Sequence, residues 1–463
     1  MIFTPQKYKI EDRPGMSFID PDEINSLLKV VSSRPLIEQA IATSLSKTRL
    51  TLLQTAVLLN APLELRPLVL KAAQDLKEQI YGNRIVLFAP LYVGNRCTNR
   101  CAYCTFRADN TMALRKTLSQ EELSQEVTAL ENEGHKRLIL VFGEHPDYSA
   151  EYIAQAVRTT YGVHSGKSGE IRRVNINAAP LSVADFMTVA SAGIGTYQIF
   201  QETYDPQLYL KYHLAGKKRD YNWRLTALDR AMQGGIDDVG LGALLGLGDW
   251  RYEVMGLVRH TNHLESCFDV GPHTISFPRI TEALGADSAE MPVKDADFIY
   301  AIAVLRLAVP YTGLILTARE GATLRDVAIR YGVSQIDGGS KLEIGSYSEN
   351  KEEQGSSQFT LHDNRSLGEV VSTLIHNGRL PSFCTACYRK GRTGEHFMEF
   401  STAGFIKRFC TPNAVLTLAE YLEDYANSEL RKEGYDLIYR EELNTETLQR
   451  LEKIRQGERD LYF

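Results

Sequence analysis

From Arg84 onward, short apolar runs alternate with amphipathic stretches along the chain. Bounded apolar runs are typical of buried strands, and apolar residues at three- and four-residue steps are typical of helices. We predict eight strands, at Arg84–Val93, Arg137–Gly143, Arg173–Ala178, Thr196–Gln201, Val239–Leu245, His273–Pro278, Gly313–Ala318 and Gln335–Gly338. Eight strands alternating with helices favour a (β/α)8 barrel of the TIM type, and an open doubly wound sheet is the alternative.

The same periodicity predicts the helices between these strands. The clearest helix start is a Ser-x-x-Glu capping box formed by Ser119 and Glu122. The predicted helical windows run from Ser119 to Gly134 and over Ser149–Tyr161, Ser182–Ala192, Asn222–Gln233, Asp249–Cys267, Ala296–Val309 and Ala322–Tyr331.

The regions flanking the barrel have a different pattern. Before it, Ser46–Leu59 and Ala61–Ile80 are predicted to be helices. After Ser340 the alternation stops, and the polar segment Glu349–Gln358 is predicted to be a linker or mobile loop. A short helix is expected after Ser366 and a helical tail from Asn413 onward. We therefore expect an N-terminal helical extension (1–83), the barrel (84–340) and a mainly helical C-terminal domain (341–463).

Composition and charge change this picture little. Charged residues make up 24% of the chain and hydrophobic residues 43%, as in ordinary globular proteins. The formal net charge of −6 argues against a nucleic-acid partner. No apolar run reaches the roughly 18 residues of a membrane span, and Met1–Glu11 has no secretory pattern. We expect a cytoplasmic protein with no membrane partner.

Six of the seven cysteines fall into two groups of three. The first group, Cys97, Cys101 and Cys104, has C-x3-C-x2-C spacing directly after the first predicted strand. Three thiolates in so tight a loop can bind three irons of a 4Fe–4S cube and leave the fourth iron open. A disulfide with a spare thiol and a zinc site completed from afar are the other interpretations. We interpret the seventh cysteine, Cys267, as a packed or surface thiol rather than a ligand.

This first cysteine loop resembles the signature of the radical S-adenosylmethionine (SAM) superfamily, which includes an aromatic residue, here Tyr103, before the last cysteine. The resemblance implies that the open iron binds the amino and carboxylate groups of SAM. It also implies that one electron cleaves SAM to methionine and a 5′-deoxyadenosyl radical. On this reading the catalytic residues are the three cysteines of the loop.

Polar residues follow other predicted strands, at the end where barrel enzymes place their chemistry. Gly143 and Glu144 follow the second strand, where the superfamily has a Gly-Gly-Glu-like motif that contacts the amine of SAM. Gln201 and Glu202 lie at the end of the fourth strand. The glycine-rich segment Val239–Gly248 lies within and after a strand, so it is a weak match to a dinucleotide fingerprint.

Two arginines near strand ends are candidates to bind a carboxylate. Arg319 follows the seventh strand, two residues after Thr317, and Arg279 follows the sixth. An arginine inside a closed barrel is costly unless an anion meets it, and a guanidinium pairs with a carboxylate in bidentate fashion. We favour Arg319 over Arg279 as the clamp for an amino-acid carboxylate.

The second cysteine group, Cys384, Cys387 and Cys410, has C-x2-C-x22-C spacing and again offers three thiolates. A zinc ribbon would show a second cysteine or histidine pair, although His396 as a fourth ligand keeps a zinc site open as an alternative. We interpret this group as the site of a second 4Fe–4S cluster with one open iron.

The chain as a whole resembles the HydG family, the radical SAM tyrosine lyases of [FeFe]-hydrogenase maturation. The matching segments are the first cysteine loop, Gly143–Pro146, Phe200–Tyr204, Gly271–Ser276 and Cys384–Gly394 with Cys410. The resemblance implies a carbon–carbon lyase that cleaves L-tyrosine to p-cresol and dehydroglycine. It then converts dehydroglycine to iron-bound carbon monoxide and cyanide for assembly of the hydrogenase active site, the H-cluster.

The resemblance also implies a set of cofactors and partners. The cofactors are two 4Fe–4S clusters, SAM, and a labile Fe(II) with free L-cysteine on the second cluster. The partners are a reductant such as ferredoxin or flavodoxin and other hydrogenase maturation proteins. We expect SAM contacts from Tyr103, Gly143, Glu144, Asn177, Gln201, Glu202, Gly242 and Leu244. We expect tyrosine contacts from Arg319, Thr317 and Arg279.

His273 opens the sixth predicted strand, so it should lie at the N-terminal mouth of the barrel, opposite the first cluster. By position alone it would be a solvated or capping residue. The second cysteine group follows the eighth strand, and in the resembled family a histidine ligates the extra iron. Because imidazole suits a ferrous ion, we predict that His273 is a ligand of the labile iron.

Two other functions fit parts of the sequence. One is a tyrosine lyase that supplies dehydroglycine (2-iminoacetate) to thiamine biosynthesis, against which the second cysteine group argues. The other is a non-catalytic iron–sulfur scaffold or carrier. A carrier would leave the polar strand ends without a role.

Overall fold

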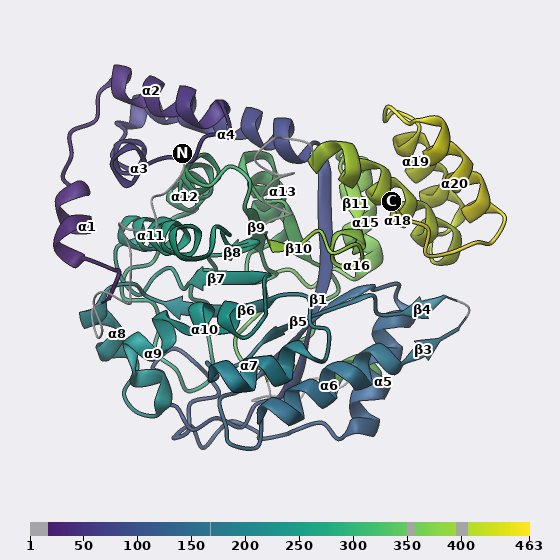
Figure 1. Ribbon diagram of the computed structural model, residues 1–463, viewed down its shortest axis with the longest axis horizontal. Coiled ribbons are helices and arrows are strands. Elements are labelled where there is room, and N and C mark those ends of the chain that lie inside the picture. The colour runs from purple at the N-terminus through teal and green to yellow at the C-terminus, as the bar shows by residue number, and fades with distance from the viewer. Residues whose placement is uncertain (1–16, 167, 350–356, 395–405) are drawn as a thin grey trace.

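The computed structural model describes residues 17–166, 168–349, 357–394 and 406–463. Eight parallel strands follow one another in the order β10-β9-β8-β7-β6-β5-β2-β1, and β10 pairs with β1 to close the ring (Figure 1). They are β1 (Arg84–Gly94), β2 (Arg137–Phe142), β5 (Arg173–Asn177), β6 (Tyr197–Glu202), β7 (Val239–Ala243), β8 (Thr274–Ser276), β9 (Gly313–Leu316) and β10 (Gln335–Asp337). Every predicted strand is present. The barrel is therefore confirmed, and the open sheet is wrong.

Helices follow the strands around the outside of the barrel. They are α5 (Gln120–Asn132), α6 (Ala150–Gly162), α7 (Val183–Ala190), α9 (Tyr221–Leu225), α10 (Ala227–Gln233), α11 (Trp250–Phe268), α12 (Asp295–Ala308) and α13 (Ala322–Tyr331). The predicted capping box of Ser119 and Glu122 starts α5. The window Asn222–Gln233 was predicted as one helix but forms two. Thr226 Oγ1 donates to the Asn222 carbonyl, and a hydroxyl bond of this kind bends or interrupts a helix.

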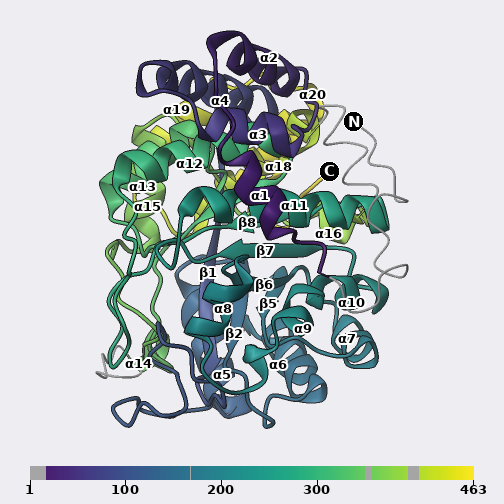
Figure 2. The ribbon, with the colours of Figure 1, turned by 90° about the vertical axis from the view of Figure 1, so that its left-hand side faces the viewer.

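Four helices precede the barrel in the described residues: α1 (Pro21–Leu27), α2 (Arg34–Leu45), α3 (Leu52–Leu59) and α4 (Arg66–Tyr81). A short 3-10 turn, η2 (Leu63–Leu65), precedes α4. Helix α4 packs on α12 and α13, and α3 packs on α11 (Figure 2). The predicted helix over Ser46–Leu59 is wrong in its first half, because α2 ends at Leu45 and Thr51 caps a new helix with Gln54.

Several short elements were not predicted. They are the hairpin of β3 (His164–Ser165) and β4 (Gly169–Glu170), the helices α8 (Pro206–Tyr212) and α14 (Ser346–Glu349), and the 3-10 turn η3 (Lys217–Arg219). Residues 350–356 of the predicted linker lie outside the described residues. None of the helices in the described part of the chain has the length and apolar character needed to cross a bilayer.

Among the described residues, the C-terminal part contains α15 (Leu367–His376), β11 (Leu380–Ser382), α16 (Ala386–Arg389), α18 (Ile406–Asp424), α19 (Ser428–Ile438) and α20 (Thr445–Arg455). Strand β11 pairs in parallel with the first residues of β1, whereas β2 pairs with β1 only from Ala89 onward. The C-terminal part is thus hydrogen-bonded into the barrel sheet at the start of its longest strand (Figure 1). The domain limits at 83 and 340 stay predictions.

Candidate active site

The upper mouth of the barrel, where its strands end, lies beneath the first cysteine loop. The upper cysteine group (Cys97, Cys101 and Cys104) follows β1, and its three residues line one cavity. The loop is held down by backbone bonds, among them the Ala102 N–H donated to the Tyr212 carbonyl at 2.9 Å. The fold therefore brings three thiols from one short loop to a single space, which is the donor set of a 4Fe–4S cluster with one open iron.

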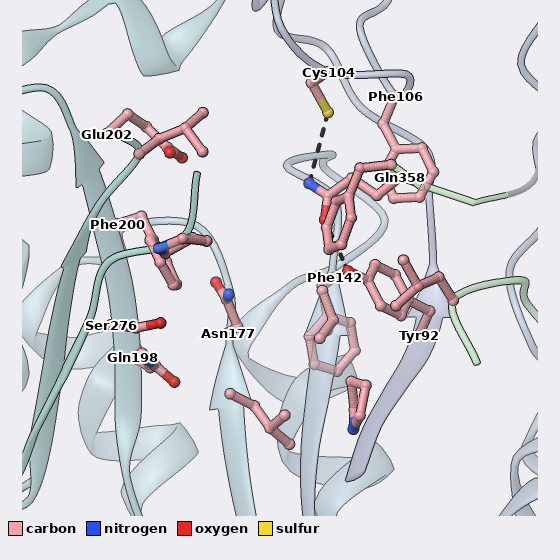
Figure 3. A pocket seen from close by; sticks show the side chains of 18 of the residues that line it. Tyr92, Cys104, Phe106, Phe142, Asn177, Gln198, Phe200, Glu202, Ser276 and Gln358 are labelled. Atoms are coloured by element: carbon pink, nitrogen blue, oxygen red, sulfur yellow. Dashed lines mark hydrogen bonds between the residues drawn. The ribbon is translucent and has the colours of Figure 1, made fainter. Parts of the chain in front are cut away.

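The cavity opens to solvent, and its empty volume, counted out into the open solvent, is about 1400 Å³. Figure 3 shows Tyr92 and Phe106 facing Phe200 and Glu202 across this space, with Cys104 above them. The polar and charged residues of its lining other than cysteine include Glu144, Asn177, Glu202, Lys218, Arg224, Thr317 and Arg319.

Gly143 and Glu144 directly follow β2, beside the cysteine loop. A Cβ at Gly143 would lie 2.1 Å from the Arg96 carbonyl oxygen, so this close passage requires glycine. Glu144 Oε2 accepts a hydrogen bond from Asn99 Nδ2 at 2.7 Å and lies 3.9 Å from Arg224 Nη1. The carboxylate is thus fixed at the cavity wall, where it can accept bonds from an ammonium group.

Glu202 is directed into the cavity by a local irregularity of the sheet. Its φ of 69° is unusual for a residue other than glycine, and the register between β6 and β7 shifts at this point. Lys218 Nζ lies 2.7 Å from Glu202 Oε1, and Arg224 Nη2 lies 3.9 Å from the same oxygen. Two carboxylates, Glu144 and Glu202, therefore lie next to the buried Arg224, and Glu202 also pairs with the half-buried Lys218.

Sequence reasoning missed Lys218 and Arg224. Lys218 lies in η3, and Arg224 lies in α9 and donates from Nε to the Phe200 carbonyl at 2.6 Å. A signal was present, because three consecutive basic residues, Lys217 to Arg219, follow a strand whose end is acidic.

Thr317 and Arg319 present unused polar groups to the same cavity. Thr317 Oγ1 is buried without a hydrogen-bond partner among the described residues. Arg319 stacks its guanidinium 3.3 Å from the centre of the Phe359 ring and forms no ion pair within the described part of the chain. Burial lowers the pKa of Arg319. Arg279, in contrast, pairs with Glu320 and lies outside the cavity lining.

The predicted SAM contacts divide into two sets. Tyr103, Gly143, Glu144, Asn177, Glu202 and Leu244 line the cavity, but Gln201 and Gly242 do not. Gln201 alternates with Phe200 and Glu202 along β6, and its amide has no partner among the described residues. A Cβ at Gly242 would lie 2.5 Å from the Phe200 ring, so a larger residue here would clash with Phe200 in the cavity wall.

The lower cysteine group (Cys384, Cys387 and Cys410) lies at the opposite mouth, where the strands begin. Its three residues line a second cavity together with His273. His273 comes directly before β8, and its backbone N–H donates to the Val239 carbonyl at 2.8 Å. The structure thus places His273 beside the second group of thiols. It lies at the N-terminal mouth of the barrel, as expected from its position before a strand.

The two cavities share five strands or their flanking residues. Toward the lower mouth these contribute Val86, Arg137, His273, Gly313 and Gln335. Farther along the same strands, Phe88, Ile139, Ser276, Ile315 and Asp337 line the upper cavity. Residues two or more positions apart on one strand therefore serve the two ends of a single barrel interior.

Buried arginines make the lower mouth positively charged. Arg84 and Arg137 line its cavity, and Arg173 stacks on the Tyr388 ring. Arg137 Nη1 donates to the Cys384 carbonyl at 2.7 Å, while Arg137 Nε and Arg173 Nη1 have no partner among the described residues. Burial lowers the pKa of Arg137 to about 10. Such a surplus of buried cations suits an anionic occupant.

Asp238 is the carboxylate nearest to these arginines. It lies 3.6 Å from Arg173 and 3.5 Å from His273 Nδ1. Burial raises the pKa of Asp238 to about 6. Burial, followed by the charges of the arginines, holds the pKa of His273 well below its usual range.

The arginines of the lower mouth also form a pattern in the sequence. Arg84, Arg137 and Arg173 each open one of three successive strands of the barrel. This pattern alone does not predict a buried site, because a basic residue at the start of a strand can equally lie at the surface. His396, the candidate fourth ligand of a zinc site, lies outside the described residues.

Comparison with known proteins assigns both halves of the barrel region. The family model of the radical SAM superfamily matches residues 91–258, and the model of the Biotin and Thiamin Synthesis associated domain matches residues 276–379. Radical SAM domains use a 4Fe–4S cluster and SAM, which agrees with the donor set of the upper cysteine group.

Three relatives extend the likeness over most of the chain. A crystal structure of HydG, a maturase of the [FeFe]-hydrogenase, is 44% identical, with a TM-score of 0.92 over 97% of this chain and 100% of that one. HydG from Carboxydothermus hydrogenoformans is 38% identical, with a TM-score of 0.82 over 94% of this chain and 97% of that one. The 2-iminoacetate synthase of Salmonella typhimurium is 32% identical over 315 residues, 68% of this chain and 81% of its own length.

The 2-iminoacetate synthase match leaves about a third of this chain uncovered, whereas the first HydG structure spans 97% of it. With that coverage and identity, the chain belongs to the HydG family of radical SAM enzymes.

Proposed function

We propose that this protein is a radical SAM lyase that cleaves L-tyrosine at the upper mouth of its barrel and builds an iron-bound carbon monoxide and cyanide product at the lower mouth. The observation that carries the proposal is the pair of three-cysteine sites at opposite ends of one barrel interior. The product would serve assembly of the [FeFe]-hydrogenase active site, in keeping with the function named for the similar HydG structure.

At the upper mouth, the three cysteines would hold a 4Fe–4S cluster whose open iron binds SAM. When bound, these groups supply the 5′-deoxyadenosyl radical that abstracts hydrogen from tyrosine. Glu144, held by Asn99 and Arg224, would accept hydrogen bonds from the ammonium group of SAM. The apolar walls of the cavity would keep water away from the radical.

Arg319 and Thr317 would fix the amino-acid end of tyrosine. A guanidinium that meets no carboxylate of the described chain is suited to pair with the substrate carboxylate. The nearby Thr317 hydroxyl, which is buried without a partner in the described residues, would bond to the same end of the substrate. Arg279 is already paired with Glu320, so we assign it no direct contact with tyrosine.

At the lower mouth, Cys384, Cys387 and Cys410 would hold a second 4Fe–4S cluster. His273 would ligate an additional labile Fe(II), which also carries free L-cysteine. The buried arginines of this cavity fit such a group, because thiolate clusters and cyanide are anionic and Arg137 and Arg173 retain unpaired donors within the described structure. We further propose a ferredoxin or flavodoxin as reductant and other hydrogenase maturation proteins as partners.

The second candidate is tyrosine cleavage that ends at 2-iminoacetate, the product named for the Salmonella typhimurium relative. That activity would use only the upper mouth. The lower cavity, with three cysteines, a histidine and buried arginines, would then have no role.

Product analysis separates these functions. Anaerobically reconstituted protein is incubated with SAM, dithionite and L-tyrosine, and 5′-deoxyadenosine, p-cresol, carbon monoxide and 2-iminoacetate-derived glyoxylate are quantified. We expect the first three products, with carbon monoxide in amounts comparable to p-cresol. Abundant glyoxylate with no carbon monoxide would favour the second candidate. Absence of both 5′-deoxyadenosine and p-cresol would indicate a non-catalytic carrier.

A further inference from the structure

The described residues contain a third group of metal-ligating side chains, outside the barrel interior. It consists of Asp229 on α10 and of His263 and Cys267, which lie one turn apart on α11. One ligand atom from each side chain lies within 4.8 Å of the other two. Asp229 Oδ1 is 2.6 Å from His263 Nε2, and Cys267 Sγ is 4.0 Å from the same nitrogen. No step proposed for the two cavities uses these residues.

The three side chains differ in exposure in a way that suits a site reached from solvent. His263 is completely buried, Asp229 is 7% exposed, and Cys267 is exposed. Phe18 stacks on the His263 ring with their centroids 3.9 Å apart and an interplanar angle of 4°, so the imidazole has a fixed orientation. A metal ion would approach from the side of Cys267 and meet the other two ligands at the base.

Asp229 provides an independent observation that favours a bound cation. Its Oδ1 atom meets His263, but its buried Oδ2 atom has no hydrogen-bond partner among the described residues. A buried carboxylate oxygen without a hydrogen-bond partner destabilises the folded protein. A cation bound next to the carboxylate would remove this cost. A simple Asp–His hydrogen bond would leave it in place.

The types of ligand restrict the ion. Carboxylate, imidazole and thiolate together are typical of Zn²⁺ and of similar first-row divalent ions, whereas Mg²⁺ and Ca²⁺ prefer oxygen ligands alone. Three protein ligands would leave a fourth position of a tetrahedral ion for water or another ligand. The i, i+4 spacing of His263 and Cys267 on α11 places both on one face of that helix.

We propose that Asp229, His263 and Cys267 form a third metal site, which binds one Zn²⁺ or similar divalent transition ion on the outer side of the barrel. Helix α11 ends at Phe268, and the chain then leads through Gly271 to His273, so the site lies at the lower end of the barrel. Cys267, expected from the sequence to be a packed or surface thiol, is here a ligand.

Zinc binding by the holoenzyme tests this site. Protein with both clusters loaded is dialysed anaerobically against buffered Zn²⁺, and bound zinc, iron and sulfide are counted per chain. We expect one zinc in the wild type and a loss of affinity greater than about 100-fold in Cys267→Ser and Asp229→Asn, beyond the usual effect of removing a supporting residue. Iron and sulfide should not change. His376→Gln, at an exposed histidine on α15, is the matched control.

Alkylation of Cys267 gives a readout that does not depend on how much zinc binds elsewhere. Zn²⁺ should slow carbamidomethylation of Cys267, followed by peptide mass spectrometry, in the wild type and in His376→Gln. It should have no effect on this rate in Asp229→Asn. The proposal is overturned if zinc leaves the rate unchanged in the wild type, or if Cys267→Ser and Asp229→Asn retain wild-type zinc binding.

Discussion

At the residue scale, Arg319 is suited to bind an anionic substrate group in the upper cavity, because its guanidinium has no carboxylate partner among the described residues. The guanidinium lies over the Phe359 ring. Arg279, the other candidate, is already paired with Glu320. An arginine with donors available at the cavity wall is prepared for an anion, whereas a paired arginine would first have to give up its partner.

We therefore predict that Arg319→Ala weakens tyrosine binding by about 2–5 kcal/mol, the usual cost of removing one partner of a buried charged pair. Binding is measured by equilibrium dialysis with SAM present and without reductant, so that no turnover occurs. Arg319→Lys, which keeps the charge but loses the fork of donors, should fall between Arg319→Ala and the wild type. Unchanged tyrosine affinity in Arg319→Ala would exclude this residue as the clamp.

His273 is a barrel residue that lies beside the lower cysteine group. It lines the same cavity as Cys384, Cys387 and Cys410. We predict that His273→Ala retains p-cresol formation but loses the additional iron and the iron–carbonyl product. Electron paramagnetic resonance and an iron count measure the first loss, and infrared spectroscopy measures the second. An intact signal of the additional iron in His273→Ala would return His273 to a capping role.

At the element scale, α11 supports the loop that follows β6. Glu253 on α11 accepts hydrogen bonds from Thr203 Oγ1 at 2.6 Å and from the Tyr204 N–H at 2.8 Å. Burial nevertheless raises the pKa of Glu253 from 4.5 to about 8. Between these two values the folded protein binds more protons at this site than the unfolded chain. The contribution of Glu253 to stability is therefore present at low pH and is lost as the pH rises toward 8.

Replacing Glu253 by Gln keeps an acceptor and removes the titration. We predict that the free energy of unfolding of Glu253→Gln, relative to the wild type, increases as the pH rises from 5 to 8. Anaerobic urea unfolding at both pH values measures this difference. Glu151→Gln, at an exposed position of α6, should show no such trend. A difference that is the same at both pH values would mean that Glu253 does not titrate in this range.

The elements show why some of the fold was predictable from the sequence. Barrel strands are buried on both faces, so they leave apolar runs, and all eight were found. Strand β11 was missed because it has three residues and contains Pro381, which usually argues against a strand. The short elements α8 and η3 carry too few residues to show a periodicity. With η3, the cation Lys218 beside Glu202 was missed as well.

The residues of the candidate site that lie close together in the sequence were predictable, and those that only the fold brings together were not. The C-x3-C-x2-C loop, the Cys384–Cys387 pair with Cys410, and the position of His273 before a strand could be read directly from the sequence. The buried cations at both mouths, such as Arg224 and Arg173, could not, because their role depends on which side chains the barrel brings near them. Gln201 shows the same limit, since the alternation of β6 turns it away from the cavity that Phe200 and Glu202 line.

At the scale of the whole molecule, the barrel interior relates the two cavities. Phe88, Ile139 and Ile315 form a small apolar cluster on β1, β2 and β9. On the same strands, Val86, Arg137 and Gly313 line the lower cavity. The apolar cluster therefore lies between the lower cavity and the polar end of the upper one. We infer that a fragment of tyrosine moving from the upper to the lower site would pass this cluster.

We predict that Ile315→Phe, which fills this level of the barrel, retains p-cresol formation while carbon monoxide output falls. Overpacking can itself cost about 1–3 kcal/mol. Leu314→Phe is therefore the control, because Leu314 is the neighbouring buried residue on β9 and is absent from the linings of both cavities. Equal ratios of carbon monoxide to p-cresol in the two variants would mean that the fragments do not pass this cluster.

The central claim is that one barrel carries two sites that act in sequence, and isotope-labelled tyrosine tests it most directly. Reconstituted wild type, Cys101→Ala and Cys387→Ala are incubated with SAM, dithionite and uniformly ¹³C-labelled L-tyrosine. Infrared spectroscopy then detects labelled iron-bound carbon monoxide and cyanide, and chromatography detects p-cresol. We predict both sets of products in the wild type, neither in Cys101→Ala, and p-cresol without the labelled iron product in Cys387→Ala. Labelled iron-bound carbon monoxide in Cys387→Ala at the wild-type level would contradict the account.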